Sequence, residues 1–230
     1  MTTFSESKFA AWLQKVVSYR RQESGLYLEI ADRLPLNGPV RVLDIGTGTG
    51  LQLEAIHDLQ PKAELFGLDL SRPAIEAAGV ALEDLEVDLR VGNIAAAPFP
   101  DDFFNVITCN ASMSYWEDLR GCFNEIWRIL QPSGEALLFE PHQDIDIAAA
   151  LAQIRENMSD KSPLRRWGAV QLNKFGLQRG SRIGMKLYSR QELIDLVCAS
   201  NFGENYSVEE VSLLNLPIFL CIHLWKPADR

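Results

Sequence analysis

An acid followed by three glycines at alternate positions is the first pattern in this chain that could support chemistry. Asp44 ends a short apolar run, and Gly46, Gly48 and Gly50 follow it. The run is typical of a buried parallel strand, and the residues after the glycines are typical of a helix start. Glycine lets the backbone turn sharply and leaves room for a ligand against it. Because open α/β sheets bind ligands at the carboxyl ends of their strands, the pattern predicts a ligand site at this turn.

A nicotinamide dehydrogenase is the first alternative for such a turn. Its fingerprint, Gly-x-Gly-x-x-Gly/Ala, needs a small third residue where the helix and strand pack closely beside the pyrophosphate. In this chain the third position falls on Leu51 or Leu53, depending on which glycine starts the count. Both side chains are bulky, so the spacing disfavours a pyrophosphate site.

Two further apolar runs lead to polar residues in the same way. The run at 64–69 ends in Asp69, about 20 residues beyond the glycines, where a carboxylate can accept both hydroxyls of a ribose. The run at 87–91 leads to Asn93 and Ile94. The end of the run at 64–69 therefore fits a nucleotide-like ligand.

These motifs resemble, in their order and spacing, those of the class I S-adenosylmethionine-dependent methyltransferases. Gly-x-Gly-x-Gly with an acid two residues before it resembles motif I of that family. Residues 98–107 resemble the stretch that leads into the family's fourth strand, with Asn105 where Asp is usual. Residues 129–139 resemble its turn into strand five, with Ser133 in place of one Gly. The resemblance covers residues 38–142 well and the remainder more loosely.

The resemblance implies S-adenosylmethionine as the cofactor, S-adenosylhomocysteine as its product, and no metal. In the family an acid after the third strand binds the adenine amino group. Asn93 stands at that position, and its side-chain carbonyl can still accept a hydrogen bond from an amino group. The cofactor residues expected from the matching positions are Asp44, Gly46, Thr47, Gly48, Gly50, Asp69, Leu70, Asn93, Ile94 and Asn110.

The methyl acceptor must be held in line with the methyl group, and a hydroxyl or ammonium acceptor must also lose a proton. His142 follows the fifth predicted strand and is the candidate base, because its ordinary pKa lies near neutral pH. The alternative is a histidine with a surface or capping role. Tyr19 and Tyr115 are candidates for the acceptor pocket, although an aromatic residue on an amphipathic helix is more often part of the core.

A basic segment follows the predicted strands. Residues 161–186 include Lys and Arg side chains but no acid. In the resembled family the insert after strand five commonly covers the acceptor site. Arg165, Arg166 and Arg179 are therefore candidates to bind an anionic acceptor, since Arg binds carboxylate and phosphate through two hydrogen bonds. The alternative is a solvated loop, or a patch that pairs with acidic surface.

Strands and helices alternate along the chain, which predicts a parallel sheet with right-handed crossovers. Together with the resemblance, this gives an α/β fold: a Rossmann-like, doubly wound, seven-stranded, mostly parallel sheet with an antiparallel C-terminal edge hairpin and an N-terminal helical lid. One domain is expected, divided into a lid (1–35), a cofactor-binding core (38–142), an acceptor-side insert (143–188) and a C-terminal helix and hairpin (189–230). The predicted strands are 40–45, 64–69, 86–91, 105–109, 135–140, 207–213 and 217–225, and the predicted helices are 4–34 with a break near Gly25, 50–59, 73–83, 119–130, 145–158 and 189–201.

Composition narrows the range of partners. The formal net charge of −9 opposes binding to nucleic acid, which needs a basic surface. No apolar run is long enough for a transmembrane helix, and no secretory signal is apparent, so we expect a cytoplasmic protein without a membrane partner. The four cysteines are widely spaced, and we expect reduced, mostly buried thiols. The sequence leaves the oligomeric state open.

The sequence thus predicts a methyltransferase that acts on a small-molecule acceptor, with oxygen as the favoured acceptor atom and nitrogen or carbon as alternatives. A different class of function also fits the motifs. A module that binds S-adenosylmethionine as a regulator, without transferring the methyl group, would keep the same glycines, Asp44 and Asp69.

Overall fold

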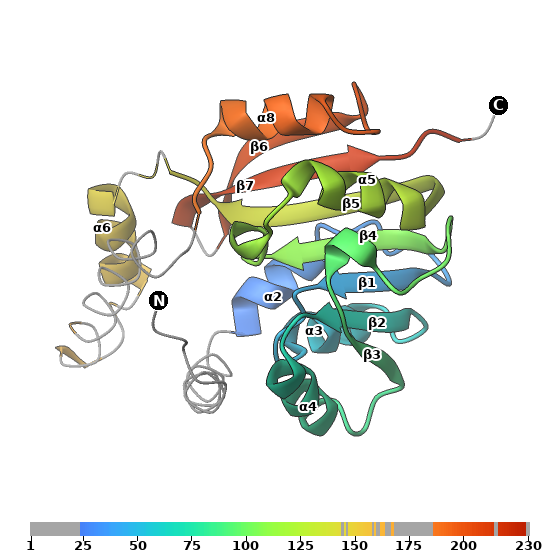
Figure 1. Ribbon diagram of the computed structural model, residues 1–230. Helices are drawn as coiled ribbons and strands as arrows, with labels where there is room; N and C mark the ends of the chain where they lie inside the picture. The colour runs from blue at the N-terminus through green and yellow to red at the C-terminus, as the bar shows by residue number, and fades with distance from the viewer. Residues whose placement is uncertain are drawn as a thin grey trace, which may run out of the picture.

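The computed structural model describes residues 24–143, 145, 147–157, 159, 162–163, 167, 186–213 and 216–228. Seven strands form one sheet in this part of the chain, and helices cover both of its faces (Figure 1). The strands are β1 (Arg41–Ile45), β2 (Glu64–Asp69), β3 (Val87–Val91), β4 (Phe104–Asn110), β5 (Leu130–Pro141), β6 (Tyr206–Leu213) and β7 (Leu216–Trp225).

The strands lie in the order β3-β2-β1-β4-β5-β7-β6. Neighbours from β3 to β5 are parallel, whereas β7 runs antiparallel to both β5 and β6. The predicted seven-stranded sheet with an antiparallel C-terminal hairpin is confirmed. The chain moves outward from β1 to β2 and β3, and then returns to the other side of β1 with β4. This reversal makes the carboxyl ends of β1 and β4 the topological switch point, where open α/β sheets bind ligands.

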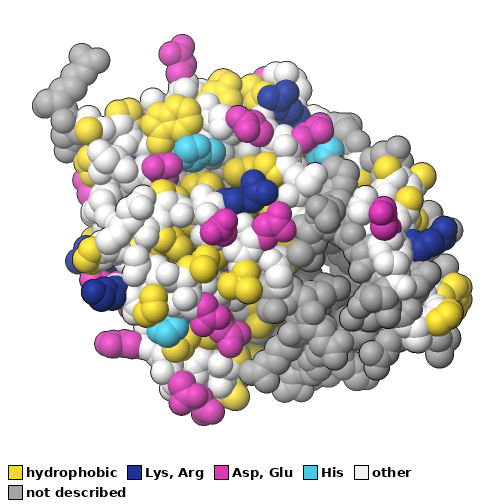
Figure 2. Space-filling view, turned by 180° about the vertical axis from the view of Figure 1, so that it is seen from behind, with side chains coloured by type: hydrophobic (Ala, Val, Ile, Leu, Met, Phe, Trp, Pro, Cys, Tyr) yellow, Lys and Arg dark blue, Asp and Glu magenta, His cyan; other side chains and the backbone are white. Residues whose placement is uncertain are grey.

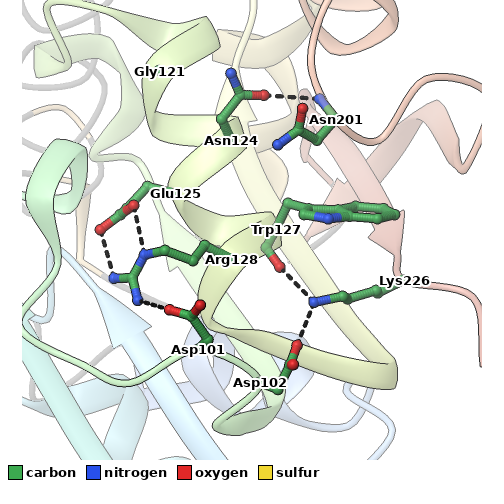
Figure 3. A pocket seen from close by; sticks show the side chains of 9 residues that line it. All are labelled: Asp101, Asp102, Gly121, Asn124, Glu125, Trp127, Arg128, Asn201 and Lys226. Carbon is green, nitrogen blue, oxygen red and sulfur yellow. Dashed lines mark hydrogen bonds and ion pairs between the residues drawn. The ribbon is translucent and has the colours of Figure 1, made fainter. Parts of the chain in front are cut away.

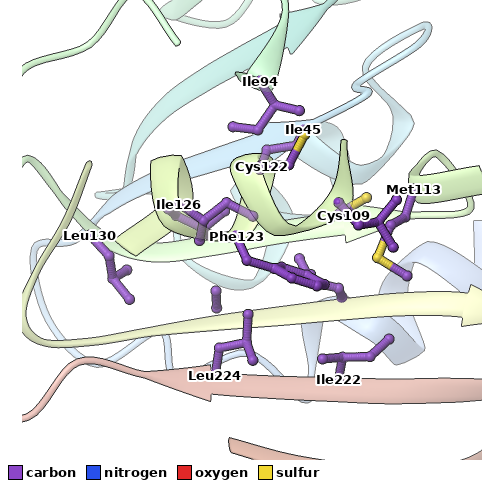
Figure 4. Close-up of a cluster of buried hydrophobic side chains, with 14 of the residues drawn as sticks. Ile45, Ile94, Cys109, Met113, Cys122, Phe123, Ile126, Leu130, Ile222 and Leu224 are labelled. Atoms are coloured by element: carbon purple, nitrogen blue, oxygen red, sulfur yellow. The ribbon is translucent and has the colours of Figure 1, made fainter. Parts of the chain in front are cut away.

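Alternate side chains of the strands enter two separate cores, as the two-residue period of a strand requires. In β1, Leu43 and Ile45 enter the core beneath α5, whereas Val42 enters the core on the opposite face. Figure 4 shows part of the first core, where Cys109 and Met113 lie near Phe123 of α5. The helical elements are α2 (Ser24–Ala31), α3 (Leu51–Leu59), α4 (Arg72–Ala81), η1 (Ile94–Ala96), η2 (Met113–Tyr115), α5 (Leu119–Ile129), α6 (Ile147–Asn157) and α8 (Arg190–Cys198).

Local side-chain bonds explain where several helices begin. Helix α8 begins with a capping box, in which the Ser189 hydroxyl accepts from the Glu192 amide and the Glu192 carboxylate accepts from the Ser189 amide. Ser71 caps α4 and Asp118 caps α5 in the same way, each accepting from a backbone amide of the first turn. Helix α3 starts differently, since its N-cap residue is Gly50 in the left-handed conformation.

Three expectations from the sequence need correction. Helix α2 covers Ser24–Ala31 and ends before residue 34, whereas the chain before Ser24, on which the expected break near Gly25 depends, lies outside the described residues. Strand β5 begins at Leu130 instead of residue 135, because Leu130 pairs with Phe104 of β4 before a register shift. Cys198 is exposed on α8, so it does not share the burial of Cys109 and Cys122.

The face behind the sheet carries a mixed surface. Acidic side chains are spread over the described part of this face, with basic and apolar side chains between them (Figure 2). No helix in the described ranges is both long enough and apolar enough to cross a membrane.

Candidate functional site

A carboxylate at the end of β2 holds the glycine loop that follows β1. The Asp69 carboxylate accepts from the Gly48 amide at 2.9 Å through Oδ2 and from the Ser71 amide at 2.8 Å through Oδ1. The amides of Gly46 and Thr47 both donate to the Leu68 carbonyl, at 2.7 and 3.1 Å. The two bonds from the Gly48 and Ser71 amides fix the orientation of the Asp69 carboxylate. Each carboxylate oxygen keeps acceptor capacity for a further donor, such as a ligand hydroxyl.

The glycines of this loop have different reasons to be glycine. Gly46, Gly48 and Gly50 all have positive φ angles, of 72°, 57° and 81°. A Cβ on Gly46 would overlap the Ser112 hydroxyl, and one on Gly50 would press on the Leu82 side chain. In front of Gly48 the nearest atom to an added Cβ is the Gly46 carbonyl oxygen at 3.9 Å. Protein packing therefore explains the first and third glycines, and space for a ligand lies at Gly48.

Three acids stand at strand ends along this edge of the sheet. Burial raises the pKa of Asp44 to about 7, and the nearby Asp69 charge adds to the effect. Burial also raises the pKa of Asp69 above its usual value. Burial raises the pKa of Glu140, at the end of β5, to about 7, although donors around its carboxylate oppose the shift. An edge with three desolvated carboxyl groups favours a cationic ligand, because a positive charge stabilises their ionised forms.

At the end of β4, Asn110 carries a buried side-chain oxygen without a hydrogen-bond partner among the described residues. A buried polar atom of this kind needs a donor from a ligand or a water molecule. Asn110 lies at the switch point, as the last residue of the strand that pairs with β1. The atom is therefore available to the same ligand that the glycine loop and Asp69 face.

Apolar and amide side chains lie beyond Asp69. Leu70 is 71% exposed although it directly follows a sheet strand, and Ile94 is buried. Asn93 is exposed and caps η1, with its side-chain oxygen accepting from the Ala95 amide at 3.0 Å. That oxygen has one acceptor site left for a ligand. The Gly92 amide donates to the Asp69 carbonyl at 2.9 Å, which ties the end of β3 to the end of β2.

The acceptor-side candidates lie around the end of β5. His142 is 4% exposed and forms a parallel bridge with Tyr188. The Lys186 amide donates to the Ser114 carbonyl at 3.3 Å. Tyr115, in η2, is 61% exposed, and partial burial together with the Glu140 charge raises its pKa. The chain therefore leaves the sheet after His142. Lys186 lies beside the turn after β4 that contains Ser114 and Tyr115.

Four of the predicted site residues lie outside the described residues, so the structure does not place them. They are Tyr19, Arg165, Arg166 and Arg179. The described neighbour of the N-terminal segment is α2, which packs on α3, and the Gln52 side chain in the first turn of α3 donates to the Tyr27 carbonyl at 3.2 Å. Helix α2 thus lies beside the helix that follows the glycine loop.

A polar crevice of about 400 Å³ lies at the opposite, amino-terminal edge of β4 (Figure 3). Its charged groups bind one another: Arg128 pairs with Glu125 and Asp101, and Lys226 pairs with Asp102. The Lys226 ammonium also donates to the Trp127 and Leu130 carbonyls, at 3.1 and 2.9 Å. These bonds tie the end of β7 to α5, so the crevice has a structural explanation.

Part of the chain matches a known protein family. Residues 43–138 match the family model described as a methyltransferase domain. Over 124 residues the chain is 32% identical to a demethylmenaquinone methyltransferase of Thermus thermophilus, covering 53% of each protein. Its fold is similar to that of a geranyl diphosphate methyltransferase solved in complex with S-adenosylmethionine, with a TM-score of 0.66, 17% identity, and 98% and 93% of the two chains covered. It is also similar to the [4+2]-cyclase SpnF, with a TM-score of 0.64, 15% identity, and 90% and 81% coverage.

Over residues 43–138 the chain resembles a methyltransferase domain. The resemblance to class I methyltransferases that the motifs predicted is confirmed. The chain spans about half the length of the curated relatives that it matches. The matched residues run from β1 into β5, so they contain the glycine loop, Asp69, Asn93 and Asn110.

Two residues at the carboxyl-terminal edge of the sheet, Glu140 and Ser112, were not among the site residues predicted from the sequence. Glu140 follows the same pattern as Asp44 and Asp69, an acid at the end of an apolar strand, and that signal was available. Ser112 had no comparable signal. Its hydroxyl donates to the Ile45 carbonyl at 3.2 Å and lies 3.0 Å from the Cys109 sulfur, contacts that depend on how the turn after β4 folds back.

The raised pKa of Asp44 predicts how the stability of the methyltransferase domain depends on pH. Because its folded-state pKa is about 7 and the ordinary value is 3.8, the folded protein holds a proton that the unfolded chain releases between these values. Asp44 therefore lowers stability as pH rises through this interval, by at most about 4 kcal/mol. We expect Asp44→Asn to raise the free energy of unfolding at pH 8 and to leave it nearly unchanged at pH 4.

Urea denaturation of the variant and the parent protein at both pH values measures this difference. Glu140 titrates over a similar interval, so the comparison uses the difference between the two proteins rather than the slope of either alone. An equal difference at pH 4 and pH 8 would show that Asp44 titrates normally in the folded protein.

Proposed function

We propose that this protein transfers a methyl group from S-adenosylmethionine to a small-molecule acceptor. The observation that carries the proposal is the pair formed by Asp69 and Gly48. A carboxylate oriented by two backbone amides lies beside a glycine with open space before it. The name of the Thermus thermophilus relative, a demethylmenaquinone methyltransferase, supports a small-molecule acceptor.

The residues at this edge fit the cofactor. Asp69 would accept from the ribose hydroxyls, and the backbone at Gly48 would lie against the ligand. Leu70, Ile94 and the free acceptor site of Asn93 would contact the adenine. The unpartnered oxygen of Asn110 and the buried Asp44 would face the cationic amino-acid end, with Gly46, Thr47 and Gly50 shaping the loop. When bound, S-adenosylmethionine would supply a methyl group already activated by its sulfonium charge.

Residues of this chain would then position the acceptor and remove a proton from it. In-line positioning at near-attack distance can account for a large part of the rate enhancement. His142 remains the candidate base, because it lies at the end of β5 on the acceptor side. Tyr115 is exposed in the neighbouring turn and is a candidate to contact the acceptor. Oxygen is the favoured acceptor atom, with nitrogen and carbon as alternatives.

A test of turnover separates an enzyme from a binding module. We expect the purified protein to produce S-adenosylhomocysteine when incubated with S-adenosylmethionine and a panel of quinols, phenols, carboxylic acids and amines. Mass spectrometry would identify both the product and the methylated acceptor. The similarity to a cyclase shows that this fold also occurs outside methyl transfer, so the alternative needs a distinct outcome. Tight S-adenosylmethionine binding without turnover of any acceptor would favour the module.

The basic segment leads us to propose an anionic acceptor, bound by Arg165, Arg166 or Arg179. An Arg→Lys change at the binding position should raise KM for the acceptor, because a point charge cannot replace the planar guanidinium fork. Cofactor affinity should change little, since the proposed cofactor residues lie at β1 to β4. Acceptor kinetics at several salt concentrations measure the effect for each variant.

Arg120→Lys, at an exposed position of α5, is the matched control. If KM is the same for the three variants and the control, the acceptor is not held by these arginines. The basic segment is then explained by solvation or by pairing with acidic surface.

A further inference from the structure

Glu140 meets a cluster of donors from the turn after β4. Its carboxylate accepts from the Met113 amide at 2.6 Å, the Ser114 hydroxyl at 3.3 Å and the Cys109 thiol at 3.7 Å. The side chain is 2% exposed, so water does not compete for these bonds. A carboxylate that accepts from a backbone amide forms a stronger bond than a neutral acceptor does. The end of β5 therefore holds the turn between β4 and α5.

This turn contains a residue in an unfavourable conformation. Ala111 has a φ angle of 51°, in the left-handed region that costs a residue with a Cβ roughly 1–2 kcal/mol. Such a conformation persists only when its surroundings fix it. The Ala111 amide donates to the Phe139 carbonyl at 2.9 Å, and the Met113 side chain is fully buried in the core (Figure 4). Together with Glu140, these contacts hold Ala111 in place.

The turn after β4 also shapes the start of the glycine loop. Ser112 lies between Ala111 and Met113, and its hydroxyl donates to the Ile45 carbonyl at 3.2 Å. It lies so close to Gly46 that a Cβ there would overlap the hydroxyl. A displacement of Ser112 therefore changes the space around the last residue of β1 and the first residue of the loop.

We propose that Glu140 is a positioning residue that sets the cofactor loop through the Ala111–Ser114 turn. Glu140 acts from β5, on the acceptor side of the sheet, and its effect reaches Gly46 through Ser112. The end of β5 and the end of β1 are thereby mechanically connected. The consequence for cofactor affinity rests on the proposed function, whereas the connection between the turn and the loop does not.

A direct electrostatic role is the competing explanation. The Asp69 charge raises the pKa of Asp44, and the Glu140 and Asp44 charges both raise the pKa of the Cys109 thiol. A third buried carboxylate at this edge would attract a cationic ligand through its charge alone. The two explanations make opposite predictions for two substitutions of the same residue.

Glu140→Gln keeps the length and an acceptor oxygen but removes the charge. Glu140→Asp keeps the charge but is one methylene too short to reach both the Met113 amide and the Ser114 hydroxyl. If Glu140 positions the turn, the dissociation constant for S-adenosylmethionine rises at least about tenfold in Glu140→Asp and no more than about threefold in Glu140→Gln, since unpaired buried donors cost more than a neutral partner does. The opposite order, or no effect of either substitution, would overturn the proposal.

Two further measurements distinguish the possible failures. Asn105→Ala removes a side-chain acceptor of the Arg41 amide at the amino-terminal edge of the sheet, so it should lower stability without changing cofactor affinity. Amide hydrogen exchange at Gly46 and Met113 needs no cofactor, and it should accelerate in Glu140→Asp and not in Glu140→Gln. If the parent protein does not bind S-adenosylmethionine but exchange follows this pattern, the proposed function fails and the positioning role stands. Unchanged exchange at Gly46 in Glu140→Asp would reject the positioning role, whatever the cofactor affinity.

Discussion

Replacing Asp69 by Ala should weaken S-adenosylmethionine binding by roughly 10- to 100-fold. The substitution removes the proposed acceptor of the ribose hydroxyls, and hydrogen bonds to a charged group contribute about 1–3 kcal/mol. It also removes the acceptor of the Gly48 and Ser71 amides, so the glycine loop loses one of the bonds that join it to β2. Isothermal titration calorimetry of the variant and the parent protein measures the change.

Asp88→Ala is the matched control for this prediction. Asp88 lies on the neighbouring strand β3 and pairs with Arg90 at 2.7 Å, away from the glycine loop. We expect its loss to leave cofactor affinity within about twofold of the parent, because an exposed ion pair contributes little. Unchanged affinity in Asp69→Ala would mean that the ribose is held by another residue.

Replacing Gly48 by Ala should weaken cofactor binding at least about tenfold. The added methyl group would project into the space that we assign to the ligand, where the nearest protein atom is 3.9 Å away. Gly203→Ala is a close control, because Gly203 has the same φ angle of 57° and no atom within 4 Å of an added Cβ. Both variants should lose about 1 kcal/mol of stability, since the left-handed conformation disfavours a residue with a Cβ.

Chemical denaturation and calorimetry on the two variants separate the effects. Equal stability losses with weaker binding only in Gly48→Ala would identify Gly48 as a ligand contact. If Gly48→Ala binds as tightly as Gly203→Ala does, the loop does not approach the cofactor at that residue.

Local patterns were sufficient to predict most of the fold. The sequence placed the second strand at 64–69, where β2 lies, because an apolar run with an acid at its end is bounded by turn residues. It also placed the start of α8 at Ser189, because a capping box depends on only four neighbouring residues. The glycine loop was recognised for the same reason, and Asp69 because it ends the next strand of the same strand-helix-strand unit.

Features that depend on contacts between distant segments were not predicted. β5 begins at Leu130 because this residue pairs with Phe104 of β4. A little further along, the Ser133 amide donates to the carbonyl of Lys226, the residue after β7. Ser133 has a φ angle of 64°. The family usually has Gly in that turn, and the left-handed conformation explains why. The role of Ser112 became visible only once β4 and the glycine loop were placed together, and the strand-end signal of Glu140 did not show that its carboxylate meets the turn after β4. No property of either residue in sequence indicates that they meet.

The most direct test of the account is a calorimetric titration of the parent protein with S-adenosylmethionine and, separately, with NADH. The geometry of the glycine loop, the carboxylate at the end of β2 and the acids along the same edge predict saturable S-adenosylmethionine binding at micromolar concentrations, and no comparable binding of NADH. Equal or tighter binding of NADH, with no heat from S-adenosylmethionine, would contradict the assignment of this edge as a methyl-donor site.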